Sequence, residues 1–275
     1  MEDASHAGLD IVVLVKHVPD AQFDRHINGQ DRTTDRKESI LSELDEYALE
    51  AALQLVEAHG GDPAGHRITA VTMGPSGAVN AVKKALQIGA HAGVHLCDDA
   101  LAGSDAAGTS RALAAVVAHL GTVDLVITGM ASTDGETSLV PAQLAERLDL
   151  PQVTFASSLD LLQEEGTWTL TARRDGDVYS ETVEATLPAV VSVTDQINEP
   201  RYPNFKGIMA AKKKPLTTLS LQDLGVDPDE VGSAGAWTTV HAADPRPPRS
   251  QGTIISDDGD AGVRLVDFLA AQKLL

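Results

Sequence analysis

Residues 124–148 read DLVITGMASTDGETSLVPAQLAERL, which is a strand pattern, a polar loop and a helix pattern in succession. Residues 124–128 form a β-branched run that predicts a buried strand, and residues 139–148 have the apolar spacing of a helix. The same change of period recurs earlier in the chain. Strand patterns occupy residues 11–15, 67–73 and 94–97, and helix patterns occupy residues 45–58, 78–88 and 110–120. Alternating strands and helices predict a doubly wound α/β fold with a mainly parallel sheet.

The loop between that strand and helix, Gly129–Ser138, is rich in Gly, Ser and Thr. A strand end, such a loop and a helix N-terminus together present backbone N–H groups and the positive end of a helix dipole. Phosphate binds in this arrangement, so the sequence predicts an anion site. The alternative is an ordinary helix start, capped by the hydroxyl of Thr137 or Ser138.

Beyond Pro151 the sequence predicts strands without helices between them. Alternating or apolar runs occupy residues 153–160, 167–174, 178–186 and 189–193. We expect antiparallel or mixed strands that extend the parallel sheet.

The last part of the chain reads as an extended arm. It contains the proline-rich segment 244–248 and finishes in a helix pattern at residues 262–275. We therefore divide the chain into an α/β domain, residues 1–225, and a C-terminal arm, residues 226–275, that packs on a partner subunit.

Composition narrows the possible functions. The chain of 275 residues carries a formal net charge of −19 and one cysteine, Cys97. The acidity argues against nucleic acid as a partner, and a single cysteine suits a reducing cytoplasm. No apolar run approaches the length of a membrane span, so an integral membrane protein is not expected.

The sequence lacks the motifs of common enzyme classes. No dinucleotide-binding glycine motif follows residues 11–15, and neither a P-loop nor a nucleophile elbow is present. The nine histidines are scattered, and the spacing of His91 and His95 across a Gly-containing turn does not favour a metal site. We expect no catalytic residues and no metal.

A second informative stretch, residues 197–215, reads INEPRYPNFKGIMAAKKKP. Pro200 and Pro203 disfavour a helix before Gly207, so Phe205 is expected in a polar loop that precedes a short basic helix. A large apolar side chain on such a loop usually contacts a partner, although it can also fold back onto its own domain.

These residues carry a resemblance to a known family. The run from Asn198 to Lys214 resembles the recognition loop of the β subunit of electron transfer flavoprotein, in an actinobacterial-like form. Further matching segments follow in family order: Val15–Asp20, Asp45–Ala52, Gly74–Pro75, Ala85–Ala90 and Leu187–Val190. The resemblance covers roughly residues 10 to 225 and implies the adenine-nucleotide-binding type of α/β fold.

The resemblance implies an electron carrier rather than an enzyme. Such a subunit pairs with an α subunit, accepts electrons from acyl-CoA and related flavin dehydrogenases, and passes them to a membrane quinone oxidoreductase. Phe205 takes the place of the family's apolar anchor. The implied partner-docking residues are Asn198, Pro200, Arg201, Tyr202, Phe205, Ile208 and Met209.

The resemblance also implies two cofactors, AMP in the β subunit and FAD shared with the α subunit. The residues implied for the β-subunit site are Leu14, Val15, Lys16, Ser42, Glu43, Leu44, Asp45, Met73, Gly74, Gly129, Met130, Ala131, Ser132, Thr133, Asp134, Gly135, Glu136, Thr137, Ser138, Leu139 and Val140. Ser138, Leu139 and Val140 stand where the family commonly has Asn, Gln and Thr. Glu136 adds a carboxylate that disfavours phosphate unless it points to solvent.

Near the flavin, the family's aromatic residue aligns with Ala21 in the loop His17–Phe23, and Phe23 is a candidate replacement. Two alternatives stay open. One is an electron-bifurcating variant with a second FAD in the β subunit, which Asp134–Thr137 partly resembles. The other is a stand-alone adenine-nucleotide-binding protein.

Overall fold

The computed structural model of the chain describes residues 8–29, 32–244, 247–249 and 251–275. The chain divides into two compact units, Met1–Val240 and His241–Leu275. The first unit extends beyond residue 225, because Val226 and Val231 are buried in it. Pro245 and Arg246, from the predicted proline-rich segment, lie outside the described residues.

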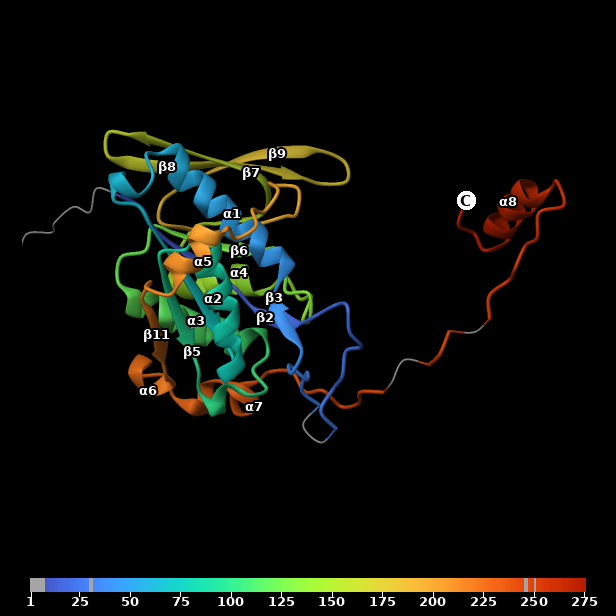
Figure 1. Cartoon of the computed structure of the whole chain (residues 1–275), viewed down its shortest axis with the longest axis horizontal. Helices are drawn as coiled ribbons and strands as arrows, with labels where there is room; N and C mark the ends of the chain where they lie inside the picture. Colours follow the sequence, from blue (N-terminus) through green and yellow to red (C-terminus); the bar gives the residue numbers. More distant parts are fainter. Residues whose placement is uncertain (1–7, 30–31, 245–246, 250) are drawn as a thin grey trace, which may run out of the picture. The chain divides into compact units, whose positions relative to one another are not determined.

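A nine-stranded sheet forms the centre of the first unit, in the order β11-β5-β4-β1-β6-β10-β7-β8-β9 (Figure 1). Its strands are β1 (Asp10–Leu14), β4 (Arg67–Met73), β5 (Ala92–Leu96), β6 (Leu125–Gly129), β7 (Gln152–Glu164), β8 (Thr167–Asp175), β9 (Ser180–Thr186), β10 (Ala189–Val193) and β11 (Leu216–Leu219). All neighbouring strands pair in parallel except β7–β8 and β8–β9, which are antiparallel. The predicted doubly wound, mainly parallel α/β fold is confirmed.

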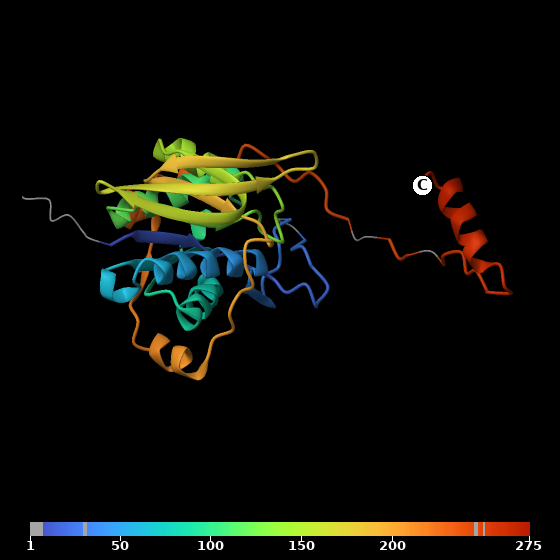
Figure 2. The ribbon, with the colours of Figure 1, turned by 90° about the horizontal axis from the view of Figure 1, so that it is seen from above.

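Helices cover both faces of this sheet (Figure 2). One face packs against α1 (Glu43–Ala58) and α2 (Val79–Ile88), and the other against α3 (Ala106–Leu120) and α4 (Val140–Leu148). Alternate residues of β1 serve the two cores, since Ile11 and Val13 join the first and Val12 and Leu14 the second. This strand therefore needs apolar residues at successive positions, as buried parallel strands do.

The remaining elements are short. They are β2 (His17–Pro19), β3 (Ser39–Leu41), α5 (Phe205–Ala211), α6 (Leu221–Leu224), α7 (Gly232–Gly235), the terminal helix α8 (Ala261–Ala271) and the 3₁₀ turns Asp62–Ala64, Ser76–Ala78, Asp99–Leu101 and Pro228–Glu230. No helix among the described residues is both long and apolar enough to cross a membrane.

Three parts of the fold differ from the sequence-based expectation. Strand β10 lies between β6 and β7 and is parallel to both, because all five of its residues are buried. Strand β11 and the two-stranded β2–β3 sheet were not predicted, since runs of three or four residues carry little periodicity. Helix α5 begins at Phe205 rather than after Gly207, because the Asn204 side chain caps it by accepting from the Gly207 N–H.

Helix α8 belongs to the second unit and has no buried residue. Val263, Leu265, Val266 and Phe268 are all exposed large apolar side chains on it. A helix with such a surface normally packs against another element.

Candidate functional site

A cavity of about 840 Å³ lies at the carboxyl ends of the parallel strands in the first unit. Strand β1 runs between β4 and β6, and the chain reverses its direction of winding there, which is where ligands bind in open α/β sheets. Twelve residues predicted for the nucleotide site line this cavity: Leu14, Val15, Lys16, Asp45, Met73, Gly74, Gly129, Ala131, Ser132, Thr137, Ser138 and Val140.

The loop after β6 leaves the N-terminus of α4 without a side-chain cap. Leu139 is the N-cap, so the predicted alternative of a capping Thr137 or Ser138 is wrong. Within the described residues, the backbone N–H groups of Thr137 and Ser138 donate to no protein acceptor. Ser138 has a positive φ of 53°, a conformation that turns successive N–H groups toward one side. The loop therefore offers donors to an anion.

Gly129 is required by a close approach between β6 and α1. A Cβ on Gly129 would lie 2.7 Å from the Leu44 carbonyl oxygen and 2.8 Å from Asp45 Oδ1. The Asp45 carboxylate accepts from the Gly129 N–H and, at 2.7 Å, from the Lys16 N–H. Asp45 thus ties the end of β1 to the end of β6.

Burial raises the pKa of Asp45 to about 7, although the N–H groups of Lys16 and Gly129 partly oppose this rise. The native state therefore binds a proton that the unfolded state releases at lower pH. The free energy of unfolding should fall as the pH rises from the ordinary value of 3.8 toward 7, and should level off above it.

We expect Asp45→Asn to remove this decline, because an amide does not ionise. The measurement is urea unfolding at pH 5, 6, 7 and 8, and the readout is the slope of the free energy of unfolding against pH. The absolute stability is not the readout, because the amide of Asn keeps only one of the two acceptor oxygens of Asp45. A variant that keeps the wild-type slope would contradict the assignment.

Two cations that line the cavity, Lys16 and Arg36, share one carboxylate that lies behind them. Asp134 accepts from Lys16 Nζ at 2.8 Å and from Arg36 Nη2 at 2.6 Å, and its side chain is only 4% exposed. Burial alone would raise the pKa of Asp134, but Lys16 and Arg36 hold it well below its usual range. Lys16 and Arg36 thus share a single carboxylate, while Asp45, Asp98, Asp99 and Asp105 also line the cavity.

Other predicted residues lie beside the cavity rather than on its surface: Ser42, Glu43, Leu44, Met130, Thr133, Asp134, Gly135, Glu136 and Leu139. Glu136 is exposed, which removes the expected conflict with a phosphate. Leu139 is also half exposed.

Sequence reasoning missed Arg36 and a strap formed by residues 236–240, which line the cavity except for Trp237. Asp105 Oδ2 fixes the strap by accepting from the N–H groups of Trp237 and Thr238 at 2.8 and 3.0 Å. No motif marks Arg36 or the strap. Asp105 was detectable from the sequence only as a candidate N-cap of α3.

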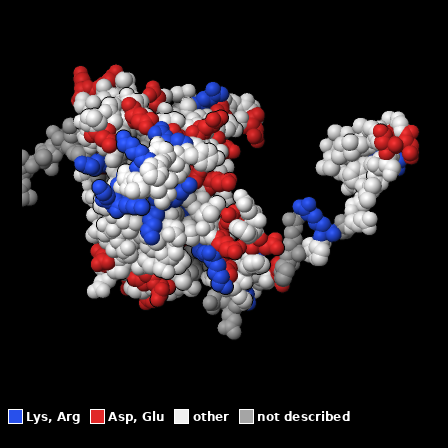
Figure 3. Space-filling view, viewed as in Figure 1, with Lys and Arg blue, Asp and Glu red and all other residues white. Residues whose placement is uncertain are grey.

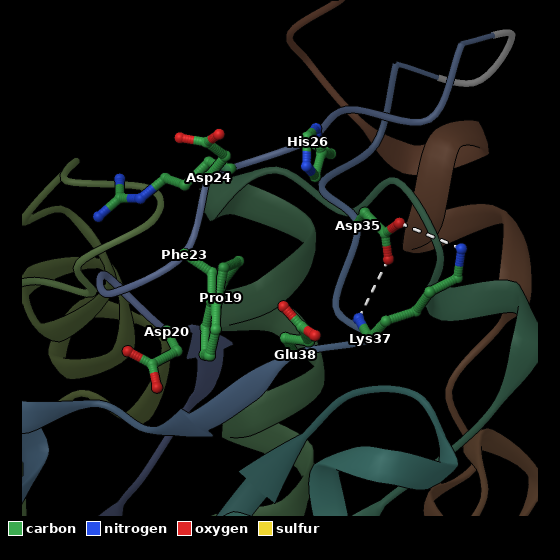
Figure 4. Close-up of a pocket in the computed structure, with 9 residues that line it drawn as sticks. Pro19, Asp20, Phe23, Asp24, His26, Asp35, Lys37 and Glu38 are labelled. Carbon is green, nitrogen blue, oxygen red and sulfur yellow. Dashed lines mark hydrogen bonds and ion pairs between the residues drawn. The ribbon is translucent and has the colours of Figure 1, made fainter.

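The predicted flavin loop borders a second hollow, of about 300 Å³ (Figure 4). Pro19 and Phe23 line one part of it, and the ion pair of Asp35 with Lys37 lines another. Phe23 is half exposed, so an aromatic face is available in the loop that carries Ala21.

The recognition segment presents apolar side chains to solvent. Tyr202 is 89% exposed and Phe205 78%, and Ile208 and Met209 are exposed on α5. The alternative that Phe205 folds back into the core is wrong. Basic side chains gather around α5 and α2 (Figure 3).

The other predicted docking residues have different surroundings. Pro200 is partly buried. Asn198 and Arg201 bond to α1: the Asn198 side chain donates to the Tyr47 carbonyl, and Arg201 pairs with Glu50 and Glu57.

Comparison with known proteins shows the family of the chain. The Electron transfer flavoprotein domain family matches residues 33–224. The electron transfer flavoprotein subunit beta of Mycobacterium tuberculosis (strain ATCC 25618 / H37Rv) is 45% identical over 268 residues, covering 97% of this chain and 99% of the relative. The corresponding subunit of Thermoanaerobacterium thermosaccharolyticum is 34% identical over 271 residues, covering 97% and 100%. The caffeyl-CoA reductase-Etf complex subunit CarD of Acetobacterium woodii is 33% identical over 248 residues, covering 90% and 91%. By extent and identity, the chain belongs to the electron transfer flavoprotein family, as one of its β subunits.

Proposed function

We propose that this electron carrier subunit holds AMP, covers the FAD of an α subunit, and acts in the cytoplasm. In this proposal it accepts electrons from acyl-CoA and other flavin dehydrogenases and passes them to a membrane quinone oxidoreductase. The observation that carries the proposal is the uncapped N-terminus of α4 beside Lys16 and Arg36, in one cavity.

A phosphate suits this wall for electrostatic reasons. Lys16 and Arg36 share the one carboxylate of Asp134, and the dipole of α4 adds positive potential beside this cluster. The carboxylates of Asp98, Asp99 and Asp105 also line the cavity. The apolar side chains of Leu14, Val15 and Met73 line another part of the cavity and suit an adenosine.

A second FAD in place of AMP is the competing assignment. It is favoured by the volume of about 840 Å³, in the upper part of the range of ligand sites, and by the sequence Asp134–Thr137. The similarity to a subunit of the caffeyl-CoA reductase-Etf complex points the same way.

The deciding experiment is co-expression with the cognate α subunit, acid release of bound nucleotide and its identification by chromatography. A yellow heterodimer with one AMP and one FAD is expected. Two FAD per heterodimer would favour the bifurcating variant. A chain that carries nucleotide but does not pair would instead indicate a stand-alone binding protein.

We propose that Phe205 anchors the partner dehydrogenase. Phe205→Ala should weaken docking by about 2 kcal/mol, or about thirtyfold, as expected for a hot-spot residue. The measurement is the KM for the heterodimer in electron transfer from a purified acyl-CoA dehydrogenase, with kcat, FAD content and AMP content unchanged.

The thermal midpoint of this variant should also stay the same, because the Phe205 side chain is mostly exposed. Leu162→Ala, which shortens an exposed apolar side chain on β7, is the matched control. An unchanged KM in Phe205→Ala would refute the anchor.

A further inference from the structure

Arg201 lies in the recognition loop, yet its guanidinium faces α1. Its Nε and Nη2 donate to the two carboxylate oxygens of Glu50 at 2.7 and 2.9 Å. Its Nη1 and Nη2 donate to Glu57 at 2.6 and 3.0 Å. The two carboxylates therefore occupy most of the planar donor set that would bind a partner's carboxylate.

The two carboxylates differ in burial. The Glu50 side chain is 5% exposed and the Glu57 side chain 55% exposed. The Glu50 carboxylate accepts in addition from the Arg201 backbone N–H at 3.3 Å. Since a buried charge requires a partner, the pair with Glu50 fixes both the side chain and the backbone of Arg201.

A second bond ties the same loop to α1. Asn198 Nδ2 donates to the Tyr47 carbonyl oxygen at 3.0 Å. Tyr47, Glu50 and Glu57 follow one another along the helix, so the loop before α5 is held at several points.

The other end of the recognition segment is fixed on α2. Lys214 Nζ donates to the carbonyl oxygens of Leu86 and Gly89, at 2.9 and 3.2 Å, at the C-terminal end of that helix. A Cβ on Gly207 would lie 2.5 Å from the Gln87 carbonyl oxygen, so α5 contacts the same helix closely. Lys214 is thus partly buried and bonded to α2, whereas the neighbouring Lys212 and Lys213 are exposed.

The apolar side chains between the attachments to α1 and α2 are exposed to solvent. Tyr202 and Phe205 are among the most exposed apolar residues of the described chain. A loop held before it meets its partner loses less conformational entropy on binding than a mobile one. The attachments therefore raise the affinity of any partner that binds Phe205.

We propose that Arg201 is a positioning residue: its pairs with Glu50 and Glu57 hold the recognition loop on α1 so that Phe205 is presented to the dehydrogenase. Arg201 makes no contact with the partner in this arrangement. The inference rests on the proposed role of Phe205 as the docking anchor.

The test uses changes that preserve folding. Arg201→Lys keeps the charge that Glu50 needs but loses the bidentate geometry, and Glu57→Gln weakens the more exposed pair. In the reconstituted heterodimer, each should raise the KM with an acyl-CoA dehydrogenase, by about tenfold for Arg201→Lys, with kcat and FAD content unchanged. Hydrogen exchange of residues 197–204 should become faster in Arg201→Lys.

Arg111→Lys is the matched control. Arg111 Nη2 pairs with Glu230 at 2.7 Å, away from the recognition segment, so the same chemical change should leave the KM unchanged. A rise in KM equal to that of Arg201→Lys would overturn the inference.

A double-mutant cycle with Phe205→Ala completes the test. If Arg201 acts through Phe205, Arg201→Lys should have little further effect once Phe205 is replaced. A full, additive effect would show that Arg201 acts independently and would overturn the inference. If Phe205→Ala raises the KM but Arg201→Lys does not, the anchor stands and the positioning role fails. If Phe205→Ala has no effect, the docking proposal fails, and this inference with it.

Discussion

Gly129→Ala should lower the free energy of unfolding by about 3 kcal/mol, because the new methyl group has no space. It would lie within 3 Å of the Leu44 carbonyl oxygen and the Asp45 carboxylate. Moving either group separates the ends of β1 and β6, so nucleotide retention should fall as well. Urea unfolding and the AMP content after gel filtration measure the two effects.

Gly135→Ala is the matched control in the same loop. The nearest atom to a Cβ there is Ser132 Oγ at 3.1 Å, the end of a side chain that can rotate. This change should alter the free energy of unfolding by less than about 1 kcal/mol. Equal effects of the two substitutions would contradict the close-approach argument.

A chain that ends at Val240 should bind the α subunit about 4 kcal/mol more weakly, or about a thousandfold, than the full chain. The reason is the surface of α8, whose apolar residues are exposed within the second unit. The cavity proposed for AMP belongs to the first unit, so AMP binding by the shortened chain should persist. Isothermal titration calorimetry of each chain with the α subunit measures this loss of affinity.

Point variants separate the role of α8 from a general effect of shortening. Leu265→Asp places a charge among the apolar residues of α8 and should cause much of the same loss of affinity for the α subunit. Arg264→Gln should leave that affinity unchanged. Full affinity of the shortened chain would refute the proposed role of the arm.

The sequence was sufficient to predict the architecture because long, periodic segments dominate it. The strand and helix on either side of Gly129–Ser138 fall within a residue or two of the expected positions. By contrast, β11 has only four residues, and its place beside β5 depends on pairing between distant segments. Periodicity does not report such pairing.

The candidate site was predictable to a different extent. Residues at strand ends, such as Lys16 and Gly129, could be predicted as site residues because the fold places the ends of parallel strands together. Arg36 was not, since it reaches the cavity from an irregular segment. The resemblance implied that Arg201 is a docking residue. Its pair with Glu50 could not be predicted, because Glu50 lies 151 residues away and nothing in the local sequence reveals it.

The order of the strands also has a consequence for how the chain folds during synthesis. Strand β10 inserts between β6 and β7, and β11 pairs with the open edge of β5, so both late strands complete a sheet begun at residue 10. Until Leu216–Leu219 has been made, the edge of β5 at residues 93–96 offers unpaired backbone groups to other chains. Sheets that depend on distant strands also form slowly. The nascent subunit is therefore most prone to aggregate while its recognition segment is being synthesised, just before β11 can cover that edge.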